Sequence, residues 1–205
     1  MALFEDWCQC ERTDTGRKHL LKYTEKDGGR EKIEADFPGV LRSHYDDVAR
    51  IVDDIAQLGY NGAAALLAER MPRSIRARSG ELGEILATEL VEENLGYRVP
   101  VRRLRYKDGR EMALRGDDFI GVVVEADGNL RFAKGESKSR ENLSKATIAE
   151  AREVLSRDAG RPTPTSILFV ADRLMDLGGS DVNRRWIGTP YRHPKGTPLS
   201  GEFGR

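Results

Sequence analysis

A long amphipathic helix followed by three apolar runs, all between residues 79 and 138, constrains the fold more than any other part of the sequence. The helix is predicted to begin near Ser79, which could cap it, and to end at Gly96. Strands are then predicted over residues 97–106, over residues 112–114 running toward 119–125, and over residues 130–138. Asp-Gly pairs at the two intervening turns favour hairpins, so the sheet is predicted to be antiparallel.

The rest of the chain extends this pattern on both sides. Downstream, apolar residues from Ile148 to Leu155 recur at helical spacing, and residues 165–170 are predicted to form a buried strand. Upstream, helices are predicted over residues 43–59 and 63–71, whereas residues 1–40 indicate a few strands or irregular structure. The break at Pro72 divides the chain into an N-terminal, largely helical lobe, residues 1–72, and a core with a C-terminal tail, residues 73–205. Helices and strands in this order predict an α/β layer arrangement.

Three acidic residues and one lysine occupy matching places in the predicted elements. Glu84 leads an apolar stripe on the helix, and Asp118 directly precedes the apolar run that begins at Phe119. Glu136 and Lys138 end the last predicted strand, where side chains two residues apart share one face. Because the two strands are predicted to pair, we expect Glu84, Asp118, Glu136 and Lys138 to converge.

This set of side chains is typical of a metal-dependent phosphodiesterase. Phosphodiester hydrolysis needs an activated water and neutralisation of phosphate charge, which a divalent metal supplies. Mg²⁺, with Mn²⁺ as an alternative, prefers oxygen ligands, so Glu84, Asp118 and Glu136 are the expected metal ligands. Lys138 would orient the water or stabilise developing charge.

Rival positions stay open at this point. Asp117 competes with Asp118, and Glu81 competes with Glu84 from one helical turn earlier. As isolated residues, Asp118 would be a turn carboxylate and Glu84 a solvated or salt-bridged helix residue. The sequence also leaves open whether one or two metals bind.

The arrangement of charge is more informative than its total, since 34 basic and 34 acidic residues cancel. Seven cations lie between residues 98 and 115, namely Arg98, Arg102, Arg103, Arg105, Lys107, Arg110 and Arg115. They are either a phosphate-binding patch or a solvated, arginine-rich hairpin. Lys134 and Arg140 flank the expected site and are predicted to be general phosphate contacts.

Other features limit the compartment and the cofactors. No apolar run approaches the roughly 20 residues of a membrane span, and the first residues lack a signal-peptide pattern, so a cytoplasmic location is predicted. Cys8 and Cys10 are too close for an unstrained disulfide and are expected to be reduced thiols. Neither a membrane nor a small-molecule ligand is expected as a partner.

The motifs that contain Gly83-Glu84, Gly116-Asp117-Asp118-Phe119 and Glu136-Ser137-Lys138 resemble those of the PD-(D/E)XK nuclease superfamily. More narrowly, residues 78–84, 115–119 and 134–138 resemble the HamA family, the nuclease subunits of the Hachiman anti-phage defence system. The superfamily's usual Pro before the first Asp is absent here, with Gly116-Asp117 in its place, so the motif does not decide between Asp117 and Asp118.

The resemblance implies a restriction-endonuclease-like core, a mixed sheet flanked by helices. It also implies a bacterial effector that associates with a helicase subunit, HamB, and degrades DNA on phage infection. The family's metal-binding acids map to Glu84, Asp118 and Glu136, and its lysine maps to Lys138. Two alternatives remain: a stand-alone repair or restriction-type nuclease, and a non-catalytic DNA- or protein-binding module of the same fold.

Overall fold

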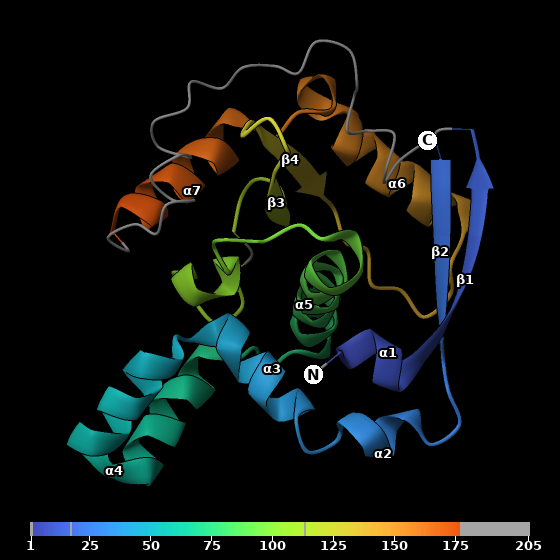
Figure 1. Ribbon diagram of the computed structural model, residues 1–205. Coiled ribbons are helices and arrows are strands. Elements are labelled where there is room, and N and C mark those ends of the chain that lie inside the picture. Colours follow the sequence, from blue (N-terminus) through green and yellow to red (C-terminus); the bar gives the residue numbers. More distant parts are fainter. Residues whose placement is uncertain (1, 17, 113, 177–205) are drawn as a thin grey trace.

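The computed structural model describes residues 2–16, 18–112 and 114–176, and the predicted C-terminal tail lies outside them. Helices dominate these residues, and the strands form two separate antiparallel pairs, β1 with β2 and β3 with β4 (Figure 1). The α/β prediction is confirmed. In the described residues, however, the sheets have two strands each, so the larger mixed sheet that the resemblance implies is not present there.

Helix α5, Ile75–Leu95, lies at the centre of the molecule (Figure 1). It begins before the predicted start because Ser74, not Ser79, accepts the capping hydrogen bond from the Ala77 amide. Ile75 in the first turn is 84% exposed, so this turn does not extend the buried apolar stripe of the helix. The predicted end is confirmed, since Gly96 adopts the left-handed conformation at φ 68°.

Side chains of α5 pack into three separate apolar clusters. Ile85 packs with Tyr45 and Leu104, and Val91 packs with Tyr97 and Phe119. Leu86 and Leu90 pack against the cluster that contains Leu3, Phe4 and Ile33. The helix therefore holds the N-terminal elements and the strands on opposite sides of one rigid rod.

Strands β3, Phe119–Val124, and β4, Leu130–Gly135, form the predicted hairpin, with Phe119 opposite Gly135 and Val124 opposite Leu130. The strand predicted over residues 97–106 is wrong. Only a single bridge joins Arg98 to Val122, and a short 3-10 helix, η1, follows at Arg103–Tyr106. Pro100 explains the break, because proline has no backbone N–H to donate to a sheet ladder.

Helices α6, Lys145–Ser156, and α7, Pro164–Asp176, follow the hairpin, with η2, Arg157–Gly160, between them. Helix α6 was predicted, but α7 replaces the strand predicted over residues 165–170. Ser166, Val170 and Leu174 are buried at intervals of four residues, a spacing that places them on one face of a helix. Val170 and Leu174 pack against Ile120 and Val122 of β3.

The N-terminal elements are α1, Leu3–Trp7; β1, Cys8–Thr15; β2, Lys18–Glu25; α2, Gly29–Ile33; α3, Phe37–Tyr45; and α4, Val48–Arg70. Cys8 is paired with Glu25 and Thr15 with Lys18 in the β1–β2 hairpin, and both cysteines are free. Helix α4 joins the two predicted helices through a break at Gly59. The domain boundary at residue 72 stays a prediction.

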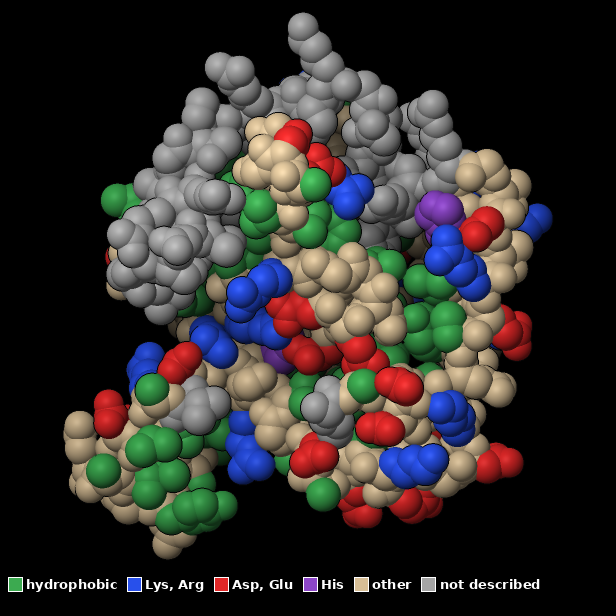
Figure 2. Space-filling model, viewed as in Figure 1, with side chains coloured by type: hydrophobic (Ala, Val, Ile, Leu, Met, Phe, Trp, Pro, Cys, Tyr) green, Lys and Arg blue, Asp and Glu red, His purple; other side chains and the backbone are tan. Residues whose placement is uncertain are grey.

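Hydrophobic side chains gather on α4, which projects from the lower left of the molecule (Figures 1 and 2). Val52, Leu58, Tyr60 and Leu66 are each about half exposed or more. Across the part of the chain that the structure describes, no helix has the length and apolar character needed to cross a membrane.

Candidate nuclease site

Asp118 and Glu136 lie side by side at one end of the β3–β4 hairpin. Asp118 directly precedes β3 and Glu136 directly follows β4, and the residues next to them, Phe119 and Gly135, are partners in the ladder. The Ser137 amide donates a hydrogen bond of 2.6 Å to Asp118 Oδ2. Strand β4 ends at Gly135, so Glu136 and Lys138 lie just beyond the strand that was predicted to contain them.

Gly135 makes this close pairing possible. A Cβ atom built at residue 135 would overlap the aromatic ring of Phe119. The ring therefore lies across the backbone of β4 and fixes the strand end from which Glu136 projects. Sequence reasoning missed this positioning role, although a glycine within an apolar strand often marks such a close approach.

Helix α5 meets the segment after β4 at Gly83. A Cβ atom at residue 83 would lie 3.4 Å from Ser139 Cβ and 3.5 Å from Ser137 Oγ. The hydroxyl groups of Ser79 and Ser139 form a hydrogen bond of 2.7 Å between the same two segments. These contacts bring Glu84, the residue after Gly83, beside the acidic end of the hairpin.

The Glu84 side chain is partly buried and stands out among the acids of this region. It forms no hydrogen bond or ion pair with any residue among those described, and burial raises its pKa to about 8. The negative charge of Asp118 is the second cause of this rise and that of Glu81 a smaller one, while Arg103 and Lys107 act in the opposite direction. A buried carboxyl group that feels neighbouring acids is a common feature of functional sites.

Glu136 and Lys138 form an ion pair in which the side chains are 6% and 18% exposed. Burial raises the pKa of Glu136; the hydrogen bond from Lys138 opposes the rise and the charge of Asp118 adds to it. For Lys138, burial acts to lower the pKa, but the carboxylates of Glu136, Glu150 and Asp118 outweigh it, so the net pKa is raised. Lys138 is thus a fixed cation beside the acids.

The rival acids are both occupied by structural partners. Asp117 is 1% exposed, forms an ion pair of 3.1 Å with Lys134, and accepts a hydrogen bond of 2.7 Å from the Thr163 amide. The prediction of Lys134 as a phosphate contact is therefore wrong, because its ammonium group is buried against Asp117.

Glu81 is occupied in the same way by side chains of the core. It forms an ion pair with the buried Lys107 and accepts a hydrogen bond of 2.8 Å from the Tyr45 hydroxyl. Geometry thus favours Asp118 over Asp117 and Glu84 over Glu81 as the side chains that are free to bind a ligand.

The seven cations between residues 98 and 115 are mostly structural, so neither predicted alternative describes them. Arg102 pairs with Glu89 and Glu92, and Arg105 donates to the Ser43 carbonyl and to Asp47. Lys107 pairs with Glu81, Arg110 pairs with Glu69, and the buried Arg103 donates to the Arg115 carbonyl. These side chains join the 3-10 helix region to the surrounding helices.

The acidic cluster matches a divalent cation in its donor chemistry. Carboxylate oxygens are the ligands that Mg²⁺ and Mn²⁺ prefer, and a cation would relieve the repulsion between Glu84 and Asp118. Among residues 2–16, 18–112 and 114–176, no three acidic, histidine or cysteine side chains converge closely enough to form a ready-made metal cage. Glu136 is paired with Lys138, so its side chain would have to rotate before it could bind a metal together with Glu84 and Asp118.

Comparison with known proteins shows the family to which this chain belongs. The model of the HamA family matches residues 1–191. The Hachiman protein HamA of Bacillus cereus is 26% identical over 185 residues, which cover 87% of this chain and 66% of that protein. The chain thus spans just under two thirds of the length of this relative. The match includes all four candidate residues and confirms the resemblance seen in the motifs: the chain belongs to the HamA family.

Proposed function

We propose that this chain is a metal-dependent nuclease that hydrolyses phosphodiester bonds in DNA. The observation that carries the proposal is the cluster of Glu84, Asp118 and Glu136 with Lys138, placed where α5 meets the end of the β3–β4 hairpin. Asp118 and Glu136 are held by strand register, and the partly buried Glu84 carboxyl group forms no hydrogen bond or ion pair with the described residues. A carboxyl group with a purely structural role would be expected to have a polar partner, as Asp117 and Glu81 do.

The residues divide the chemistry between them. Glu84, Asp118 and Glu136 would hold Mg²⁺ or Mn²⁺. The bound metal would lower the pKa of a water ligand and neutralise phosphate charge. Lys138 places an ammonium group next to Glu136, where it stabilises the charge that develops on the phosphate oxygens. The Ser137 amide fixes one oxygen of Asp118, which leaves the other oxygen for the ligand.

The order of elements supports a PD-(D/E)XK type of core. In that interpretation, α5 carries the first acid, the β3–β4 hairpin carries the second acid and the Glu-x-Lys pair, and α6 follows. The hairpin is smaller than a full mixed sheet, with Arg98 bridging to Val122 as the start of a third strand. This assignment accounts for the position of every candidate residue.

We further propose a role in anti-phage defence with a helicase partner, and membership of the HamA family supports this role. A relative is the Hachiman protein HamA of Bacillus cereus. The chain has a formal net charge of zero, and most cations between residues 98 and 115 are engaged in structural contacts. Weak intrinsic attraction to DNA is the expected result. A helicase subunit that delivers the nuclease to DNA would compensate for this weakness.

The test is plasmid cleavage with Mg²⁺ or Mn²⁺, with and without a HamB-like helicase subunit. Lys138→Gln is the site variant. Lys145→Gln, an exposed lysine at the start of α6, is its matched control. We expect metal-dependent cutting that Lys138→Gln reduces at least about 100-fold and Lys145→Gln leaves within about threefold.

The possible results distinguish between the proposed functions. Cutting that requires the helicase supports the defence effector, whereas equal cutting without it supports a stand-alone nuclease. Absence of cutting with either metal and the helicase, or cutting that Lys138→Gln leaves unchanged, would refute the proposed site.

A further inference from the structure

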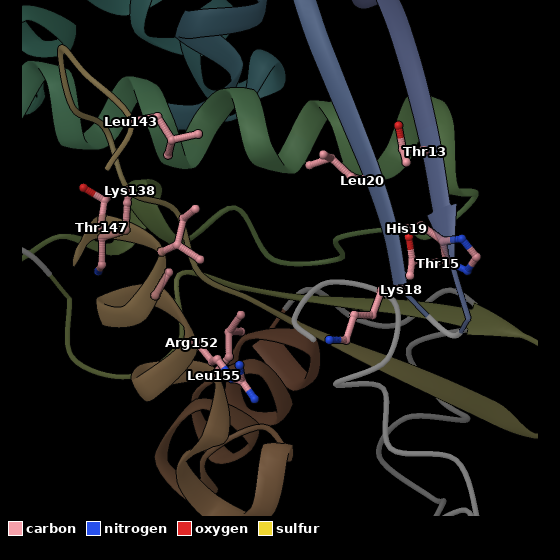
Figure 3. A pocket seen from close by; sticks show the side chains of 12 residues that line it. Thr13, Thr15, Lys18, His19, Leu20, Lys138, Leu143, Thr147, Arg152 and Leu155 are labelled. Carbon is pink, nitrogen blue, oxygen red and sulfur yellow. The ribbon is translucent and has the colours of Figure 1, made fainter. Parts of the chain in front are cut away.

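A groove with a volume of about 660 Å³ lies between the β1–β2 hairpin and α6, and Lys138 forms part of its wall (Figure 3). The hairpin contributes the end between Thr13 and Leu20. Lys18 and Leu20 point from β2 toward α6, whereas the His19 ring points away, as the alternation of a strand requires (Figure 3). The groove therefore begins at the candidate site and runs along the hairpin.

The walls of the groove are apolar and unusually exposed. Leu20 is 64% exposed, Leu143 is 80% exposed and Ile148 is 55% exposed, and all three line the groove. Large apolar side chains gathered in one concave surface indicate a ligand that covers them. The lining has no Phe, Tyr or Trp, so a group that packs there contacts aliphatic side chains.

The charged side chains that line the groove are positive. Lys18, Arg152 and Lys138 line it, and none of its lining residues is acidic. Lys18 and Arg152 form no ion pair with residues in the described ranges, unlike most cations between residues 98 and 115. They are thus available to a ligand that carries negative charge.

We propose that this groove binds one unpaired DNA strand beside the scissile phosphate, so that the site acts on single-stranded or frayed ends. The inference rests on the proposed function, because Lys138 belongs to both the site and the groove. The volume suits about one or two nucleotides. Bases would pack against Leu20 and Ile148, and phosphates would lie near Lys18 and Arg152. Proteins that bind a single strand without reading its sequence use a positively charged groove that follows the backbone, usually with aromatic side chains beneath the bases. In this groove aliphatic side chains occupy that place.

Binding of a labelled ten-nucleotide oligothymidylate, followed by fluorescence anisotropy in Ca²⁺, tests the charge of the groove without relying on turnover. Lys18→Glu is the groove variant. Lys22→Glu is its control, since Lys22 lies on the same strand, pairs with Glu11 at 3.4 Å and does not line the groove. We expect Lys18→Glu to weaken binding at least about fivefold and Lys22→Glu to change it less than about twofold.

A second pair of variants tests the apolar wall. Leu20→Ser removes a groove side chain, and Leu168→Ser removes a leucine of α7 that is also 64% exposed but lies outside the groove. We expect only Leu20→Ser to weaken oligothymidylate binding. Tighter binding of a blunt ten-base-pair duplex than of the oligothymidylate, or equal effects within each pair of variants, would overturn the inference.

The outcomes separate this inference from the proposed function. If the oligothymidylate binds through Lys18 while plasmid is never cut, the groove assignment stands and the nuclease assignment fails. If plasmid is cut through Lys138 while Lys18→Glu behaves like Lys22→Glu, the nuclease assignment stands and the groove assignment fails.

Discussion

Replacing Glu84 with glutamine should stabilise the metal-free protein at alkaline pH. In the folded state, burial and the charge of Asp118 raise the pKa of Glu84 from 4.5 to about 8. The folded protein therefore holds this proton between about pH 4.5 and pH 8, where the unfolded chain has released it. Because the folded state binds more protons over that range, the Glu84 contribution lowers stability as pH rises through it.

The size of the effect follows from the shift. Each pKa unit corresponds to about 1.4 kcal/mol, so the full shift would cost about 5 kcal/mol above pH 8. Glutamine has the shape and neutrality of the protonated acid and avoids this cost. Allowing for water entering the site, we expect Glu84→Gln to raise the free energy of unfolding by about 2 to 5 kcal/mol at pH 8 and by less than about 1 kcal/mol at pH 5.

Urea denaturation in EDTA at pH 5 and pH 8 measures this difference. Glu81→Gln is the matched control on the same helix. It should destabilise the protein by about 3 kcal/mol, because it leaves the buried Lys107 without its anion. Adding Mn²⁺ should then stabilise the wild type and not Glu84→Gln. A Glu84→Gln protein that is less stable than wild type at pH 8 would refute the reasoning.

Two further substitutions test how the site is held. Gly135→Ala should destabilise the protein by about 2 to 4 kcal/mol and reduce cleavage, because the new methyl group overlaps the Phe119 ring. Thermal denaturation measures the loss of stability. Gly39→Ala is the control, because a methyl group at residue 39 meets open space. Asp117→Asn should cost about 3 to 5 kcal/mol in urea denaturation by leaving the buried Lys134 unpaired, and a loss below 1 kcal/mol would contradict that pairing.

The hairpin part of the site could be predicted from sequence because it depends on local rules. The Asp-Gly sequence at residues 127 and 128 set the turn, and the period of two in the strands set the register. Together they brought Asp118 next to Glu136 without knowledge of the rest of the molecule. The family motifs gave the same pair.

The contacts that bring α5 and Glu84 to the hairpin could not be predicted in the same way. The choice of Glu84 over Glu81 depends on Lys107 and Tyr45, and the approach of α5 depends on Gly83 meeting Ser139, far along the chain. Sequence spacing contains no signal for such contacts. The structural role of the cations between residues 98 and 115 was missed for the same reason, because their acidic partners lie on helices distant in sequence.

The strand predicted over residues 165–170 failed for a different reason. A run of four apolar residues from Ile167 to Val170 suits a buried strand and a helix equally well. Pro164, which occupies the first position of α7, was the available cue, because proline favours the first turn of a helix.

Plasmid cleavage by Glu136→Gln and Glu150→Gln, compared with wild type in Mg²⁺ and with the helicase present, tests the central claim most directly. Both carboxylates lie within ion-pair distance of Lys138, at 3.7 Å for Glu150, but only Glu136 lies beside Asp118 at the end of the hairpin. We predict that Glu136→Gln lowers the cleavage rate at least about 100-fold and that Glu150→Gln lowers it by less than about threefold. Equal rates for the two variants would contradict a metal site at the end of the hairpin.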